Sequence, residues 1–246
     1  MSAMGGKRTL AALTSSRLRW ARSTPSGRRT LICRICDEFW QAYSAYSDAW
    51  ERAASNEDQL LAAETDETRS LIQRAADIED TDGASAFRLY LRAAEAGSVW
   101  SMGRVGWHYW TGTEVAADPQ MALEYYHRAI CGGSWIATIN YARLLAELGR
   151  HDDCERTLED GVVSGYVPAY YWLAWLRYTR SETANVRREV RPLLDHAAKC
   201  GHPRAQRLLA HWMMLRKLGL RDIPRGFGLA IELALSFPRR VRAAAF

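Results

Sequence analysis

Four short phrases of similar composition recur along this 246-residue chain at almost the same interval. Each phrase ends in a glycine, and the glycines are separated by 36, 32 and 36 residues: Gly97, Gly133, Gly165 and Gly201. Self-similarity at a period of about 20 to 50 residues is typical of stacked repeat architectures. Glycine closes a helix readily because it adopts the left-handed conformation without a Cβ clash. The spacing therefore predicts an array of helical repeats whose helices end at these four glycines.

Helical spacing continues through most of the chain, since apolar residues recur three or four positions apart and no segment alternates with period two. The most complete unit is 98–133, with one helix over 98–110 and a second that follows the N-cap residue Asp118 and Pro119. In the third unit, Pro192 predicts a helix that starts late or bends. Small residues that would let paired helices approach closely recur at two positions of each first helix: Ser101, Ala137, Ala169 and Ala205, then Gly106, Ala142, Ala174 and Ala210.

The unit 98–133 resembles a repeat of the Sel-one-like repeat (SLR) family, a relative of the tetratricopeptide repeat (TPR). Ten residues carry the resemblance: Gly106, Tyr109, Gly112, Val115, Asp118, Ala122, Tyr125, Tyr126, Ala129 and Gly133. The other units match less completely, and the resemblance covers residues 84–217. It implies an all-α fold, a right-handed α/α superhelix (solenoid) of SLR/TPR-like helix pairs. It also implies an adaptor or scaffold for other proteins, often in bacterial signalling, envelope or exopolysaccharide systems.

Four segments are predicted along the chain. Residues 1–36 form a disordered basic arm with eight basic side chains and no acidic one. Residues 37–83 form an N-terminal helical cap, because a repeat array needs a partly polar terminal element to close its core. The repeats span 84–217, and an apolar and basic helix with a tail occupies 218–246. Within the N-terminal cap, helices are predicted over residues 37–54 and 67–78.

The basic arm leaves two interpretations open, a disordered arm or a targeting segment. Its only apolar run, Leu10 to Leu13, is too short for the core of a secretory signal peptide, so none is expected. The predicted location is the cytoplasm, or the surface of the inner membrane if the tail binds lipid. The net charge is +5, but residues 37–98 carry fourteen acidic and five basic side chains. Because the repeats mix both signs, nucleic acid is not the expected partner, and the arm keeps it as an alternative.

The inner face of the array is identified by aligning the first helices on the glycines that precede them. Positions three, six, ten and thirteen after each glycine share one side of the helix, the side that lines the concave groove in TPR-like arrays. They are rich in aromatic residues and arginine, the composition of binding hot spots. The alternative that Trp107 and Trp175 pack between repeats or beneath the N-terminal helices stays open. The predicted partner-binding residues are Trp100, Trp107, Trp110, Ile139, Arg143, Tyr171, Trp175, Tyr178, Arg207 and His211.

No catalytic, cofactor-binding or metal-binding residue is predicted. The sequence contains no glycine-rich phosphate loop after a strand, no nucleophile elbow and no zinc-protease helix motif. A structural zinc site needs four ligands. The chain offers one isolated CxxC and two His/Cys pairs: Cys33 with Cys36, His151 with Cys154, and His196 with Cys200. We therefore expect a protein that is not an enzyme and has no cofactor and no small-molecule substrate.

The C-terminal segment changes character. Residues 226–237 are apolar around most of the helix circumference, and an arginine cluster follows. One interpretation is a capping helix docked on the last repeat, and another is a helix that docks into a partner. A third is an amphipathic anchor in a membrane surface, with arginines that meet anionic lipid. The predicted membrane contacts are Phe227, Leu229, Ile231, Leu233, Phe237, Arg239, Arg240 and Arg242.

These observations support three hypotheses about function. The leading one is a bacterial, non-enzymatic adaptor whose concave groove binds a peptide or a helix of a partner protein. The second is a peripheral membrane scaffold of an envelope or polysaccharide assembly, anchored by the C-terminal amphipathic helix. The third is a nucleic-acid-associated protein that uses the basic N-terminal arm, with the steep salt dependence of such binding.

Overall fold

The computed structural model describes residues 34–215 and 217–244, with side chains for all of them except 34–40, 234 and 236–244. This part of the chain contains twelve α-helices, one short 3₁₀-helix and no β-strand. The predicted basic arm lies outside it as far as residue 33. The α-helices are α2 (Arg34–Ala53), α3 (Glu57–Ala62), α4 (Asp66–Ile78), α5 (Gly83–Glu95), α6 (Val99–Thr111), α7 (Pro119–Cys131), α8 (Trp135–Glu147), α9 (His151–Val163), α10 (Val167–Arg180), α11 (Ala184–Lys199), α12 (Pro203–Met214) and α13 (Ile223–Ala244).

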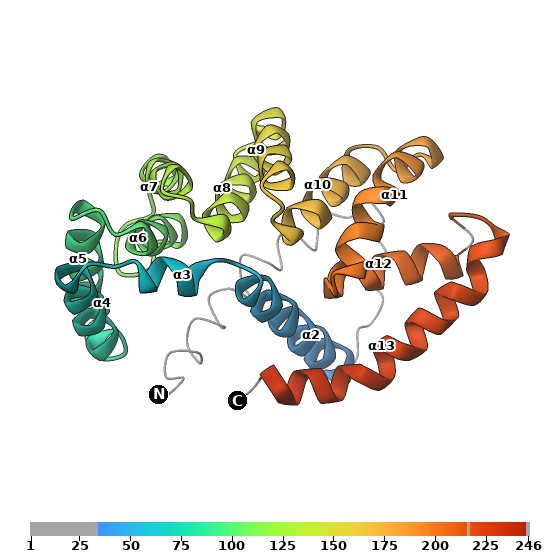
Figure 1. Cartoon of the computed structure of the whole chain (residues 1–246), viewed down its shortest axis with the longest axis horizontal. Coiled ribbons are helices and arrows are strands. Elements are labelled where there is room, and N and C mark those ends of the chain that lie inside the picture. Colours follow the sequence, from blue (N-terminus) through green and yellow to red (C-terminus); the bar gives the residue numbers. More distant parts are fainter. Residues whose placement is uncertain (1–33, 216, 245–246) are drawn as a thin grey trace.

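Consecutive helices pack as pairs. The pairs are α4 with α5, α6 with α7, α8 with α9, α10 with α11, and α12 with α13. Figure 1 shows them side by side along an arc, with α6, α8, α10 and α12 towards the inner side and α7, α9 and α11 towards the outside. The predicted fold class, an all-α array of sequential helix pairs, is confirmed.

The four repeated glycines end helices, as their spacing predicts. Their φ angles lie between +80° and +96°, in the left-handed region that favours glycine. The residue after each glycine donates its backbone N–H to the carbonyl five positions earlier, as Ser98 does to Ala93, and so satisfies one of the last carbonyls of the helix. In three of these turns the same residue then caps the next helix, because its side chain accepts a backbone N–H three positions further on: Ser98, Ser134 and His202.

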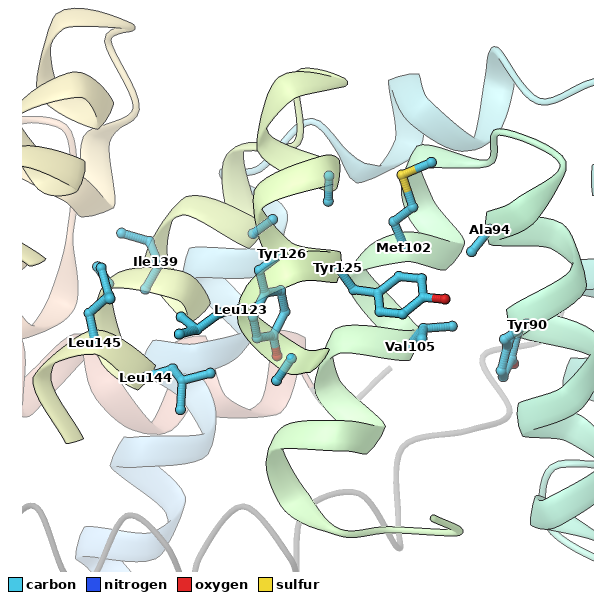
Figure 2. Close-up of a cluster of buried hydrophobic side chains, with 14 of the residues drawn as sticks. Tyr90, Ala94, Met102, Val105, Leu123, Tyr125, Tyr126, Ile139, Leu144 and Leu145 are labelled. Carbon is cyan, nitrogen blue, oxygen red and sulfur yellow. The ribbon is translucent and has the colours of Figure 1, made fainter. Parts of the chain in front are cut away.

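The predicted small residues lie in buried positions where neighbouring helices pack closely. Ser101, Ala137, Ala169 and Ala205 are all fully buried. A Cβ atom on Gly106 would lie 2.9 Å from the ring of Tyr126, so α6 and α7 can pack this closely only around glycine. Figure 2 shows the labelled side chains of this core as one continuous cluster from α5 to α8.

The two helices predicted for the N-terminal cap take different positions. The predicted 67–78 helix is α4, which pairs with α5 at the start of the array. The predicted 37–54 helix is α2, and it contacts α12 and α13 at the other end. Figure 1 shows α2 on the inner side of the arc. An N-terminal cap would cover the first helix pair, α4 with α5. Residues 37–54 lie at the opposite end of the array instead, because side chains of α10 and α12 bind them. The division of the chain into four segments otherwise stays a prediction.

Of the two alternatives predicted from Pro192, a late helix start is wrong, and a bend stays a prediction. Helix α11 begins at Ala184, capped by the Thr183 side chain, and continues through Pro192 to Lys199. The N-cap at Thr183 nucleates the helix well before the proline is reached. Pro192 therefore lies inside the helix and does not begin it.

The C-terminal helix α13 packs one side against α12 and also contacts α2. The close approach occurs at Gly226, where a Cβ atom would lie 2.5 Å from Cβ of Met213. Another side of α13 faces solvent through Phe227, Ile231 and Leu235. Among the described helices, none combines the length and the apolar character that a membrane crossing requires.

Candidate partner-binding groove

Arginines and tryptophans alternate along the inner face of the array. The guanidinium carbon of Arg143 lies 5.1 Å from the ring centroid of Trp110 and 5.9 Å from that of Trp172. The guanidinium carbon of Arg204 also lies near the Trp172 ring, at 5.5 Å from its centroid. These four residues come from α6, α8, α10 and α12, so one row of cation–π contacts links four consecutive inner helices. Each such contact contributes about 0.5–2 kcal/mol, depending on how far it is desolvated. We call this row the cation–aromatic ladder.

Helix α2 covers the C-terminal half of this inner face. Arg204 forms ion pairs with two carboxylates of α2, at 2.6 Å from Asp48 and with Glu51 as well. The indole N–H of Trp172 donates to the Glu51 carboxylate at 3.2 Å. The hydroxyl of Tyr166 donates to the backbone carbonyl of Glu51 at 3.1 Å. Residues of α10 and α12, together with the Tyr166 cap, therefore bind one short stretch of α2.

Glu51 is ionised in spite of its burial. Desolvation alone would raise its pKa, but Arg204, His202 and Trp172 outweigh that effect and lower the pKa to about 2. The His202 ring, whose Nε2 lies 3.3 Å from the Glu51 carboxylate, is also buried, and burial lowers its pKa. His202 Nδ1 accepts the backbone N–H of Ala205, which places the proton of the neutral ring on Nε2, towards Glu51.

The N-terminal half of the inner face holds a pocket of about 130 Å³. Its walls come from α2, α3, α6 and α8, and they include Trp100, Trp107, Asn140 and Arg143. Both tryptophans are partly exposed, and the Trp107 ring meets the Trp110 ring edge-on at 5.7 Å. Aromatic and polar groups thus converge on a space that remains open.

Two arginines reach this pocket in different states. Arg104 is paired with Glu79, and its guanidinium lies over the rings of Tyr90 and Trp100. Arg143 forms no hydrogen bond or ion pair with the residues that the structure describes, and burial lowers its pKa. A guanidinium held between two indoles is well placed to donate its N–H groups to a carboxylate from outside the chain.

Three of the ten predicted partner-binding residues are buried, namely Ile139, Tyr171 and Tyr178. Ile139, 1% exposed, belongs to the main core. Tyr171 stacks on His202 at 4.7 Å, and Tyr178 packs against Trp212 at 4.6 Å between ring centroids. Their predicted exposure is wrong, because the core of the array and side chains of the next repeat cover them, and their contact with a partner stays a prediction.

The other seven predicted residues are at least partly exposed: Trp100, Trp107, Trp110, Arg143, Trp175, Arg207 and His211. The pocket brings Trp100, Trp107 and Arg143 together. Arg207 lies over the Tyr43 ring of α2 at 5.3 Å. Trp175 stacks on Tyr171 and takes no part in the pocket. Contact of these seven residues with a partner stays a prediction.

Trp172 and Arg204 are residues of the inner face that are not among the predicted partner contacts. Trp172 falls seven positions after its glycine, between the positions assigned to the core and those assigned to the groove. Arg204 falls at an inner position of its helix, three after its glycine, but is not among the ten predicted residues. The signal that could have found Arg204 is charge, since Arg204 and Arg207 are inner arginines of the last repeat and the acidic residues concentrate in residues 37–98.

The predicted membrane contacts divide into three groups. Phe227 and Ile231 are 53% and 58% exposed, and Leu235, which is not among the predicted contacts, is 72% exposed at the next turn. Leu229 packs against the core beneath α12, and Leu233 is partly buried. The side chains of Phe237, Arg239, Arg240 and Arg242 lie outside the described residues.

No group of three or more His, Cys, Asp or Glu side chains with metal-binding geometry occurs among those the structure describes. In the pair at the end of α11, Cys200 Sγ lies 3.8 Å from His196 Nε2, and the His196 ring stacks on Tyr170. Cys154 is buried, and burial raises the pKa of its thiol to about 12. Cys33 and the Cys36 side chain lie outside the described residues.

Comparison with known proteins identifies the repeats. The family model described as Sel1 repeat matches residues 78–98 and 101–134, the segment from the end of α4 to the turn after α7. This part of the chain therefore contains Sel1-like repeats, and the array is a TPR-like helical repeat. No curated protein matches it significantly.

Two solved structures resemble this chain in fold. A Sel1 repeat protein from Oxalobacter formigenes is 17% identical, with a TM-score of 0.56 over 67% of this chain and 72% of the other. The second is a protective antigen of uropathogenic Escherichia coli strains with an SLR fold. It is 15% identical, with a TM-score of 0.51, and the alignment covers 82% of this chain but only 56% of the antigen. At these identities the likeness concerns the fold alone.

Proposed function

We propose that this Sel1-like repeat protein is a non-enzymatic scaffold that binds a peptide or helix of a partner protein in its inner groove. The observation that carries the proposal is the open pocket beside α6 and α8, where Trp107 and Arg143 are accessible. The Sel1 repeat family is generally non-catalytic, and no enzyme domain matches the chain. The proposal keeps the cytoplasmic location that the sequence predicts.

The cation–aromatic ladder explains why this pocket suits a protein ligand. Stacking on Trp110 and Trp172 fixes the Arg143 side chain before any ligand arrives, so little rotamer entropy is lost on binding. Trp107 offers a large apolar surface beside it. A buried aromatic anchor next to an arginine is the usual make-up of an interface hot spot.

Site-specific photo-crosslinking tests this function. A photoreactive phenylalanine analogue replaces Trp107 in one version of the chain and Val163 in a second. Val163 is 88% exposed on the outer helix α9, so it serves as the matched control. In the native host, we expect one protein to cross-link at position 107 and not at 163. Identical products at both positions, or none at 107, would contradict the proposal.

A second candidate function, a peripheral membrane scaffold, is favoured by the exposed apolar stripe of Phe227, Ile231 and Leu235 on α13. Apolar residues four positions apart on a helix face can insert into the interfacial region of a bilayer. Co-sedimentation with vesicles containing phosphatidylglycerol tests it. We expect a Phe227→Ser, Ile231→Ser variant to lose binding that Val163→Ser retains. Failure of the unaltered chain to bind these vesicles would exclude this function.

A further inference from the structure

We infer that the C-terminal half of the groove is a binding surface for an acidic amphipathic helix, and that α2 is its exchangeable internal occupant. The inference rests on the proposed function, because it names the kind of partner for the same inner face. A partner helix of matching chemistry then competes with α2.

Helix α2 occupies the groove as a bound helix would. Among its residues 41–53, whose side chains the structure describes, the buried ones are Tyr43, Ser47, Asp48 and Glu51. They share one stripe because the last three are four, five and eight positions from the first. Recognition of a helix in a groove characteristically uses anchors at such spacings. Trp50, beside the stripe, meets the His202 ring edge-on at 5.1 Å.

The interface between α2 and the repeats is more polar than the buried face of α5 within the array. Three of the four buried residues named for α2 are polar or charged, whereas α5 buries only Ala86, Phe87, Tyr90, Ala93 and Ala94. Interfaces between separable units are more polar than cores. Buried ion pairs add little net stability, but they select strongly among partners. A partner that lacks the matching charge leaves a buried charge uncompensated, which costs several kcal/mol. The surface under α2 therefore has the character of a recognition site.

The charges of the groove specify the ligand. Arg204 binds two carboxylates three positions apart on α2, Asp48 and Glu51, and Arg207 lies over an aromatic ring five positions before the first. Departure of α2 would leave Arg204 without these carboxylates next to Trp172. A replacement helix must then present an aromatic residue, four intervening residues, an acid, two intervening residues and a second acid.

Asn56, which follows the segment between α2 and α3, is fixed to the array by two hydrogen bonds. The Asn56 side chain donates to the Gly133 carbonyl at 2.8 Å, and its oxygen accepts the Trp135 backbone N–H at 3.1 Å. These two bonds hold residue 56 on the turn between α7 and α8. Residues 54–55 can therefore act as a hinge about which α2 leaves the groove while α3 and α4 stay in place.

Binding of a synthetic peptide in trans tests the inference. The labelled peptide spans residues 37–54, and its fluorescence anisotropy is measured with the full chain and with the full-length Asp48→Asn, Glu51→Gln variant. We expect the variant to bind at least about tenfold more tightly, because the intact α2 competes at a millimolar effective concentration. A peptide carrying the same two substitutions should not bind, and Arg204→Ala added to the variant should abolish binding. Equal binding of both peptides, or no binding to the variant, would overturn the inference.

A second measurement on the unaltered chain covers the case in which the variant does not fold. Hydrogen exchange by mass spectrometry should show α2 amides exchanging at least about tenfold faster than those of α6 and α8, because α2 opens locally. Protection of α2 equal to that of α6 would overturn exchangeability. Neither experiment needs the host partner. If no protein cross-links at position 107 but the peptide binds the variant, the proposed pocket is rejected and the helix-binding surface is retained.

Discussion

Arg204 of α12 forms an ion pair with Glu51 of α2, although 153 residues separate them in the sequence. The pair joins the N-terminal helix to the last inner helix of the array. Because Glu51 also accepts the indole N–H of Trp172, the two interactions determine where α2 lies. The groove is thus divided into a covered half under α2 and an open half beside α6 and α8.

Replacement of Arg204 by alanine should release α2. If α2 stayed docked, Glu51 would be a buried carboxylate without its main partner, and breaking a buried pair costs about 3 kcal/mol or more. This cost favours release of α2. We expect the free energy of unfolding to fall by about 3 kcal/mol. The loss cannot exceed the free energy with which α2 docks on the array, because α2 can leave the groove. Urea denaturation followed by circular dichroism measures it. The control is Arg156→Ala, which removes a 74%-exposed partner of Asp153 and should change stability by less than about 0.5 kcal/mol. Equal effects of the two substitutions would contradict this account.

The sequence predicts the parts of the fold that depend on local geometry. The positive φ at Gly165 and the close approach of helices at Gly106 both require glycine. Such a residue can be recognised in the sequence without knowledge of the distant contacts. The position of α2 depends instead on contacts such as Tyr43 with Arg207, which link distant segments. The exposure predicted for Tyr171 and Tyr178 is wrong for the same reason, since periodicity identifies the side of a helix but not what covers it.

Acid should weaken the docking of α2 in a defined pH range. The pKa of Glu51 is about 2 in the folded chain and 4.5 ordinarily, so its contribution is fully present above 4.5 and disappears as the pH falls towards 2. The difference corresponds to about 3 kcal/mol. His202 adds a loss below its ordinary value of 6.5, because burial lowers its pKa and the unfolded chain binds the proton first.

Stability measured between pH 7 and pH 2 checks this expectation. The chain with Glu51→Gln should lack the part of the decline that lies between pH 4.5 and 2. Superimposable pH profiles of the two proteins would show that Glu51 is not held ionised by its neighbours.

Two glycines of α6 should respond to alanine with opposite signs. A Cβ atom on Gly103 would have open space around it, and the residue lies inside a helix, so Gly103→Ala should stabilise by up to about 1 kcal/mol. The same change at Gly106 would place its Cβ 2.9 Å from the buried Tyr126 ring, and overpacking of about 1–3 kcal/mol should exceed the gain in helix propensity. Thermal unfolding measures both. A stabilising Gly106→Ala would contradict the close packing of α6 on α7.

Cysteine reactivity should report the packing of the outer helices. Cys131 and Cys200 are exposed at helix ends, whereas Cys154 is buried in α9 with its pKa raised to about 12. We expect iodoacetamide to label Cys131 and Cys200 in the native chain and Cys154 only after unfolding in urea. Peptide mass spectrometry reads each site separately. Rapid native labelling of Cys154 would mean that α9 does not pack on α8 as described.

The central claim is that the inner face, and not the outer one, binds the partner. Its most direct test is calorimetric titration of the partner segment captured at position 107 into the full chain and into Trp107→Ala. A hot-spot residue contributes about 2 kcal/mol or more, so the Kd for Trp107→Ala should rise about thirtyfold, while Val163→Ala leaves it unchanged. An unchanged Kd for Trp107→Ala would contradict the claim.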